Sequence, residues 1–248
     1  MKTALKYILQ KIFGFRRYLY LFSLFTIWGL KWNRREKDFL HFLKILPENG
    51  AVLDIGANIG VMSYYLAKKS PGCKVMAFEP IPYNYENLLK IKQRFKLQNL
   101  ATFPYALGDA DGKVNMVMPV ENSVRFHGLA HVQHESIQDL NKGEVFQCPV
   151  HKLDSIKELN YPGIKITGIK IDVENFEYYV LKGGKSLLEK HRPVIYSELW
   201  ENENRTLTMK LLTSLKYSTK VIDNGILVPW NPAIHFTQNF FFLPELMQ

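Results

Sequence analysis

Short apolar runs alternate with helix-like segments from Asn33 to the C-terminus of this chain. The runs that suit buried strands are residues 51–56, 74–80, 101–109, 168–174 and 193–199. Apolar residues at helical spacing mark the segments 39–46, 61–69, 84–95, 176–187 and 207–215. Such alternation is typical of parallel strands joined by crossover helices. We therefore predict an α/β fold with a doubly wound, mostly parallel sheet.

Two regions depart from this alternation. Residues 218–223 and 238–244 are strand-like with no helix between them, so we expect an antiparallel pair at the end of the chain. Residues 112–119 and 145–153 read as two further strands around an irregular stretch rich in His, Asn and Gln. We expect a β-hairpin-like insert at about 112–153, and an irregular connection this long is usually functional or mobile.

The charge of the chain is concentrated at its N-terminus. The 248 residues are 47% apolar, enough for the core of one such domain, and the formal net charge is +9. Eight basic residues precede the first acid, Glu36, and the rest of the chain is near neutral. The basicity is therefore a property of the N-terminal segment, and we predict no nucleic-acid partner.

An aromatic stretch lies within this basic segment. Residues 18–30 carry no charge, but these 13 residues are fewer than the roughly 20 that a spanning helix needs, and no signal-type cleavage site follows. Basic flanks and the aromatic side chains of Tyr18, Trp28 and Trp32 favour an interfacial helix on an anionic membrane leaflet. The alternative is a helix buried against the domain, or a partner-binding arm.

Cysteine usage bears on the compartment. The two cysteines, Cys73 and Cys148, are too few for a disulfide framework, and no CxxC pair is present. We therefore expect a cytoplasmic protein. Its α/β domain would cover residues 33–248, and residues 1–32 would hold it at the inner face of a membrane.

Acidic residues end five of the predicted strands. They are Asp54, Glu79, Asp109, Asp172 and Glu198. In open α/β sheets, ligands bind at the carboxyl ends of the strands. The repeated acid therefore indicates a binding site along one edge of the sheet.

The first of these acids belongs to a glycine-rich stretch, LDIGANIG, at residues 53–60. Gly56 and Gly60 allow a tight turn, and the helix that follows presents free N–H groups. A dinucleotide fingerprint would read GxGxxG, whereas this loop reads GxNxG after Asp54, a carboxylate that would repel a pyrophosphate. S-adenosylmethionine suits the loop better, because it has a cationic ammonium and sulfonium and a carboxylate for the helix N–H groups.

Glu79 strengthens this interpretation. It ends the second predicted strand, 25 residues after Asp54. An acid at this place can accept hydrogen bonds from both hydroxyls of a ribose. The alternative is a strand-end carboxylate that caps the next helix, with Pro80 fixing the turn. The loop and the acid together favour a ligand that contains a nucleoside.

Several motifs follow one another in a specific order: VLDIGANIG, FEP, ALGD, IKIDVENFEYYVLKGG, RPVIYSEL and NFFFLP. Across about residues 48–245, this order resembles the FkbM-type family of class I S-adenosylmethionine-dependent methyltransferases. The resemblance implies a Rossmann-like sheet of seven strands with an antiparallel last strand. It also implies which residues hold the cofactor: Asp54, Gly56, Ala57, Asn58 and Gly60 at the methionine end, Glu79 beside Pro80 at the ribose, and the loop from Leu107 to Asp109 at the adenine.

The resemblance places Asp172 near the transferred methyl group. The family usually has glycine after DVE, and this chain has Asn175 followed by Phe176. Asparagine tolerates a left-handed backbone better than most residues, so we expect the turn to survive. The change affects the expected shape of the acceptor site more than the cofactor site.

The acceptor side offers several candidates for catalysis. A general base helps when the acceptor is a hydroxyl, and Asp172, Glu198 and His127 are the candidates, with Glu174 as a further carboxylate. Glu174 and Glu177 could instead stabilise a helix N-terminus. From the resemblance and the membrane-prone N-terminus, we predict O-methylation of a sugar hydroxyl in a glycan, a glycolipid or a related metabolite.

Three histidines in the insert raise the question of a metal. On a helix, His127, His131 and His134 would share one face, as metal ligands can. Gly128 and the loop-like composition argue against a helix there, and the resemblance implies no metal. We therefore predict no metal site.

Two other classes of protein remain as alternatives. A nucleotide-dependent oxidoreductase could use a similar sheet, but Asp54 and the missing GxGxxG oppose it. A non-catalytic membrane-associated binding protein is supported only by the altered DVEN turn, and the intact glycine loop and Glu79 oppose it.

Overall fold

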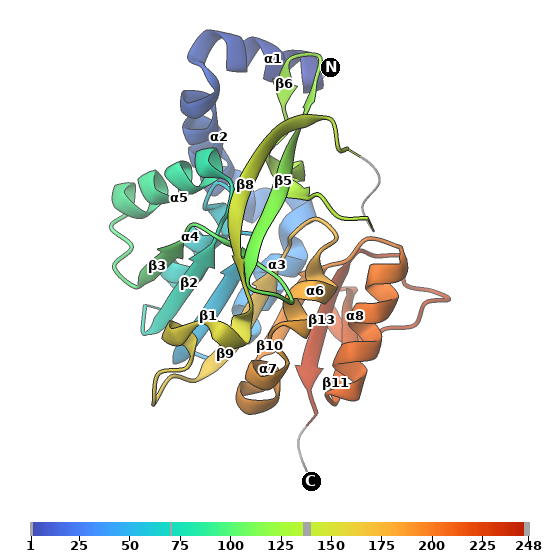
Figure 1. Ribbon diagram of the computed structural model, residues 1–248. Coiled ribbons are helices and arrows are strands. Elements are labelled where there is room, and N and C mark those ends of the chain that lie inside the picture. The colour runs from blue at the N-terminus through green and yellow to red at the C-terminus, as the bar shows by residue number, and fades with distance from the viewer. Residues whose placement is uncertain (1, 70, 136–139, 246–248) are drawn as a thin grey trace.

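The computed structural model describes residues 2–69, 71–135 and 140–245 (Figure 1). Its main sheet is built from β1 (Gly50–Ile55), β2 (Cys73–Phe78), β3 (Leu100–Phe103), β9 (Ile166–Ile171), β10 (Val194–Glu198), β11 (Tyr217–Asp223), β12 (Ile226–Pro229) and β13 (Asn239–Pro244). These strands lie in the order β12-β11-β13-β10-β9-β1-β2-β3. The five strands from β3 to β10 are parallel, and β13 is antiparallel to both of its neighbours, β10 and β11.

The predicted fold class is confirmed, and so is the antiparallel pair at the end of the chain. The number of strands differs, because the described part of the main sheet has eight strands where seven were expected. The extra strand, β12, forms a two-residue hairpin with β11 through Asn224 and Gly225, whose φ angles are 48° and 82°. An Asn-Gly pair favours this turn because both positions need positive φ.

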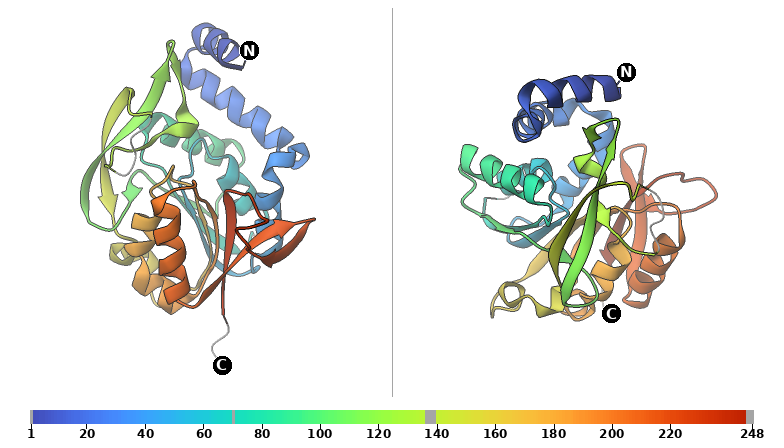
Figure 2. Two further views of the ribbon diagram at one scale, coloured as in Figure 1. Left: turned by 90° about the vertical axis from the view of Figure 1, so that its right-hand side faces the viewer. Right: turned by 45° about the horizontal axis from the view of Figure 1, so that its top comes forward.

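Helices cover both faces of the sheet (Figures 1 and 2). One group is α3 (Lys37–Ile45), α4 (Val61–Lys69) and α5 (Pro82–Arg94), and the other is α6 (Glu177–Lys182), α7 (Lys185–His191) and α8 (Glu203–Ser214). Alternate strand residues supply the two cores: Val52 packs into the first group's core, while Leu53 packs into the second group's. The doubly wound arrangement thus follows from strands that are apolar on both faces.

One predicted helix is divided in two. The segment expected at 176–187 contains α6 and α7, which meet at Gly183 and Gly184. A side chain on Gly183 would overlap the main-chain oxygen of Gly108, and one on Gly184 would press against Leu153. The break therefore lets the helix pair pack closely on the loop that follows β4 (Ala106–Leu107).

The insert forms a second sheet beside the end of the first. Besides β4, it contains β5 (Gly112–Glu121), β6 (Val124–Arg125), β7 (His131–Val132) and β8 (Gly143–His151), with a 3-10 turn at His127–Leu129. Long antiparallel pairing of β5 with β8 gives the hairpin-like shape expected from sequence. Residues 136–139 of the insert lie outside the described residues. Two further 3-10 turns, Leu153–Ser155 and Lys157–Leu159, lead from β8 to β9.

The N-terminal segment folds onto the domain as α1 (Lys2–Phe13) and α2 (Phe15–Gly29), followed by 3-10 turns at Leu30–Trp32 and Arg34–Glu36. One face of α2 packs against α4 and α5, and Leu19 and Ile27 on that face are buried. The Tyr65 hydroxyl donates to the carbonyl of Ile27 at 2.5 Å, and the Asn87 amide donates to the Ser23 hydroxyl at 3.1 Å. Among the described residues, no helix is both long enough and apolar enough to cross a membrane.

Candidate active site

A pocket opens where the carboxyl ends of β1, β2 and β9 meet the insert. The main sheet contributes the glycine loop, the end of β2 and the turn after β9, while the insert covers the opposite side. The lining residues that matter for the chemistry are Gly56, Asn58, Glu79, Pro80, Leu107, His127, Asp172, Glu174 and Phe176. The pocket therefore lies at the edge of the sheet where the sequence predicts a ligand site.

The predicted cofactor residues divide into two groups. Gly56, Asn58, Glu79, Pro80 and Leu107 line this pocket. Asp54, Ala57, Gly60 and Asp109 are not among the residues that line it. Asp109 instead pairs with the exposed Lys182 at 2.8 Å.

The glycine loop has the geometry that its sequence suggests. Gly56, Asn58 and Gly60 have φ angles of 76°, 50° and 85°. A side chain at Gly56 would overlap the main-chain oxygen of Asp172, so the loop and the turn after β9 can approach only without a Cβ there. The amides of Gly56 and Ala57 donate to the carbonyl of Phe78, which attaches the loop to β2.

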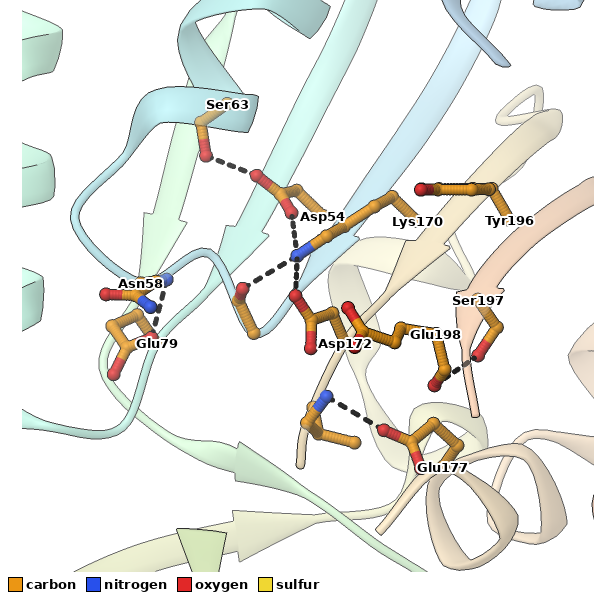
Figure 3. A network of polar contacts seen from close by, with 12 residues as sticks. Asp54, Asn58, Ser63, Glu79, Lys170, Asp172, Glu177, Tyr196, Ser197 and Glu198 are labelled. Carbon is orange, nitrogen blue, oxygen red and sulfur yellow. Dashed lines mark hydrogen bonds and ion pairs between the residues drawn. The ribbon is translucent and has the colours of Figure 1, made fainter. Parts of the chain in front are cut away.

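Asp54 is fully buried behind the loop, next to a buried lysine (Figure 3). Its carboxylate accepts a hydrogen bond from the Ser63 hydroxyl at 2.5 Å and lies 3.4 Å from the Lys170 ammonium. Lys170 also donates to the carbonyl of Gly56 at 2.9 Å and lies 3.7 Å from Asp172. Asp54 thus reaches the pocket only through Lys170 and the loop, so its charge does not meet a ligand directly as the sequence argument assumed.

Lys170 is the functional candidate that sequence reasoning missed. Burial lowers its pKa, but the carboxylates of Asp54 and Asp172 outweigh burial, so its pKa is raised and the side chain is charged. The sequence does contain a signal for it: Lys170 lies inside the apolar strand segment IKI, and a lysine stays buried there only beside a carboxylate. It joins the first and fourth parallel strands of the chain beneath the pocket.

Glu79 is buried at the pocket wall, with 4% of its surface exposed. Its carboxylate accepts hydrogen bonds from the amide of Asn58 at 2.7 Å, the amide of Ile81 at 2.9 Å and the side chain of Asn84 at 3.4 Å. Burial raises the pKa of Glu79 from 4.5 to about 7 although these hydrogen bonds oppose the rise. The carboxylate thus ties the glycine loop to α5 and also serves the helix-start role weighed as the alternative.

The raised pKa of Glu79 predicts that the ligand-free protein loses stability as pH increases. The folded state holds the proton up to about pH 7, whereas the unfolded chain releases it near 4.5, so the stabilisation is complete below 4.5 and is lost as pH rises through 7. For this shift the loss amounts to about 3 kcal/mol. Urea unfolding across this range should show a smaller fall for Glu79→Gln than for wild type. If the free energy of unfolding falls equally with pH in both proteins, Glu79 is not the group that titrates.

Carboxylates gather around the turn after β9: Asp172 and Glu174 line the pocket, and Glu198 lies beside Asp172 but outside the lining residues. Burial, together with Asp172, raises the pKa of Glu198 to about 7, and burial with Asp172 and Glu198 raises that of Glu174 to about 9. Figure 3 shows Glu198, the last residue of β10, beside Asp172, which directly follows β9, and Lys170 next to Asp172. At neutral pH, Glu198 can therefore take up a proton, whereas Glu174 already carries one.

Two residues of the DVEN turn have a left-handed backbone. Glu174 and Asn175 have φ angles of 53° and 74°, the left-handed region that asparagine tolerates. Asn202 donates to the side-chain oxygen of Asn175 at 2.7 Å, and Asn204 donates to its main-chain oxygen at 2.8 Å. Glu177 is buried and accepts from the amide of Val173 at 3.0 Å, which supports the structural role weighed for it.

The three histidines of the insert point to separate partners. His127 lies 3.0 Å from the Asn58 side-chain oxygen, and burial lowers its pKa to about 4, so it is neutral at pH 7. His131 is hydrogen-bonded to Leu129 at 2.9 Å, and the ring of His134 packs against Tyr179. Within residues 2–69, 71–135 and 140–245, no group of three such side chains could hold a metal ion.

Comparisons with known proteins identify the family of this chain. The sequence model of the FkbM methyltransferase domain matches residues 54–218. Methyltransferase sdnD of Sordaria araneosa is 26% identical over 188 residues, which are 66% of this chain and 71% of that protein. Hexuronic acid methyltransferase AglP of Haloferax volcanii is 24% identical over 215 residues, 86% of this chain and 83% of that protein.

A solved structure agrees on the fold. Methyltransferase FkbM from Methylobacillus flagellatus superposes with a TM-score of 0.53 at 16% identity, over 80% of this chain and 45% of that one. The fold is Rossmann-like, and the family model and the named relatives identify a methyltransferase that depends on S-adenosylmethionine. More narrowly, the chain belongs to the FkbM methyltransferase family.

Proposed function

We propose that the pocket binds S-adenosylmethionine and that the chain methylates a saccharide hydroxyl. The observation that carries the first part is the convergence of the glycine loop and Glu79 on one pocket. Lys170 carries one positive charge between the two carboxylates of Asp54 and Asp172, so one negative charge of this group remains for a cationic ligand, in addition to Glu79 at the pocket wall. These residues fit a cofactor that has ribose hydroxyls and a sulfonium.

The bound cofactor supplies the methyl group, and the chain's residues position the acceptor and handle its proton. Glu198 is our proposed general base: it lies beside the pocket residue Asp172 although it does not itself line the pocket, and a pKa of about 7 lets it accept the hydroxyl proton at neutral pH. Asp172 lines the pocket and is paired with Lys170. We assign it the polar role beside the methyl group that the family resemblance implies. His127 stays neutral beside Asn58 on the cofactor side, which makes it the weaker candidate.

The saccharide acceptor is supported by the relative named as a hexuronic acid methyltransferase, which is similar over 86% of this chain. A sugar acid offers both a hydroxyl and a carboxylate, and the product distinguishes them. A methyl ether survives mild alkali, whereas a methyl ester is released as methanol. We propose the ether, since a hydroxyl acceptor needs the base that Glu198 can provide.

The test incubates the protein with methyl-labelled S-adenosylmethionine and a panel of hexuronic and neutral hexose glycosides. We expect alkali-stable label on a saccharide, and loss of transfer in Glu198→Gln with cofactor affinity retained in calorimetric titration. Alkali-labile label would contradict the hydroxyl, and tight NADH binding without S-adenosylmethionine binding would favour the oxidoreductase. Cofactor binding without transfer to any saccharide would refute the acceptor class alone.

A further inference from the structure

The outer face of α2 carries a continuous stripe of large apolar side chains. Leu21, Phe25 and Trp28 on α2, with Trp32 in the 3-10 turn that follows it, recur every three or four residues and are 47%, 68%, 72% and 72% exposed. The opposite face of the same helix is the one that packs on the domain. The stripe is thus outside the core of the fold, although these are residue types that cores prefer.

The first helix exposes apolar side chains as well. Leu5, Ile8 and Ile12 recur at helical spacing on α1 and are 58%, 49% and 68% exposed. The two helices meet at an elbow at Gly14 and form the outer edge of the molecule beside β6 and α5 (Figures 1 and 2). We call these seven side chains, Leu5, Ile8, Ile12, Leu21, Phe25, Trp28 and Trp32, the outer apolar surface.

Positive charge is concentrated in the segment that carries the outer apolar surface. The first 35 residues hold eight basic residues and no acid. Arg17, Lys31 and Arg34 are exposed at the two ends of α2. A second copy of this chain would bring the same charge to the contact and be repelled, whereas anionic headgroups above an apolar layer complement both features.

The segment is fixed to the domain by contacts that leave this surface free. The Gln10 side chain donates to the carbonyl of Arg125 at 3.0 Å and accepts from its amide at 3.1 Å, which holds α1 on β6. The ring of Phe22 lies edge-on to His127, at 5.7 Å between centroids, beside the pocket. Docking therefore needs no unfolding of α2, and it would place the insert that covers the pocket close to the lipid.

We propose that residues 1–32 dock the protein on an anionic lipid bilayer. The outer apolar surface enters the interfacial region, and the basic side chains of the same segment contact the headgroups. This proposal does not rest on methyl transfer. The membrane interpretation and the buried-helix alternative are compatible. One face of α2 packs on the domain, and the opposite face is available to the membrane.

Point variants test the proposal better than deletion of residues 1–32, since deletion would also remove the buried Leu19 and Ile27 from the core. The stripe variant replaces Phe25, Trp28 and Trp32 with serine. The matched control replaces Ile226, Ile234 and Phe236 in the C-terminal region with serine. These side chains are 66%, 64% and 91% exposed. Both should fold with nearly unchanged melting temperatures.

The measurement is cosedimentation with vesicles of phosphatidylcholine alone or mixed with phosphatidylglycerol. We expect wild type and control to bind the mixed vesicles, more weakly as salt increases, and the stripe variant to lose at least about tenfold in partitioning. Substituting glutamine for Lys31, Arg34 and Arg35 should remove the preference for anionic vesicles. The proposal is wrong if wild type binds neither vesicle, if the control loses as much as the stripe variant, or if the stripe instead forms a dimer in lipid-free solution.

Discussion

Replacing Glu79 with glutamine should weaken S-adenosylmethionine binding about 100-fold. Two ribose hydroxyls that donate to an ionised carboxylate contribute together about 3 kcal/mol, and glutamine keeps one neutral acceptor in their place. The change also leaves the amide of Asn58 or of Ile81 facing an NH₂ group, which loosens the loop. Calorimetric titration of wild type and variant gives the ratio of dissociation constants directly.

The affinity of the wild type for S-adenosylmethionine, measured by the same titration, should depend on pH. Hydroxyl donors favour ionised Glu79, whose pKa is about 7 in the ligand-free protein, so affinity should rise about tenfold between about pH 6 and pH 8. The rise should be smaller in Glu79→Gln. The exposed Glu121, changed to glutamine, is the matched control and should behave as wild type. A well-folded wild type that does not bind the cofactor would remove the basis for the proposed function and favour the non-catalytic alternative.

Replacing Lys170 with methionine should destabilise the protein by about 3–5 kcal/mol. Methionine has a similar length, so little packing is lost, but the fully buried Asp54 is left without its cation and Gly56 without its donor. Urea unfolding monitored by circular dichroism measures the loss. We expect cofactor binding to weaken as well, since the loop that rests on Lys170 forms the pocket wall.

Two further variants separate the buried charge from other effects of the substitution. Lys182→Met removes a lysine whose pair with Asp109 is half-exposed, and it should cost less than about 1 kcal/mol. Adding Asp54→Asn to Lys170→Met should recover part of the stability, because the unpaired carboxylate is then gone. If Lys170→Met costs no more than Lys182→Met, the buried ion pair does not hold the strands together.

Much of the fold followed from local patterns. The strands and helices around the glycine loop lie close to their predicted positions, because apolar periodicity and turn residues act over a few neighbouring residues. The division between α6 and α7 was missed because its cause is a close approach of Gly183 to Gly108, far away in sequence. The β12 hairpin was not predicted either, although its local signal, the Asn224-Gly225 pair, is present in the sequence.

The candidate site was predicted unevenly for a similar reason. The glycine loop and Glu79 belong to short motifs, and both line the pocket. Which carboxylate pairs with which cation depends on strand order and register, and the spacing of residues in the sequence does not reveal either. Lys170 lies beside Asp54 because β1 and β9 are neighbours in the sheet although more than 100 residues separate them in the chain.

By itself, the sequence determined the alternation that leads to a doubly wound sheet, the left-handed positions of the loop and the acid at the end of the second strand. Only the tertiary structure decided that Asp54 faces Lys170 and not the pocket, and that α2 buries one apolar face while exposing the other. The physical reason is common to both. Periodicity shows which side chains share a face, but what a face meets depends on strand order and on contacts between distant segments, which form only when the chain folds.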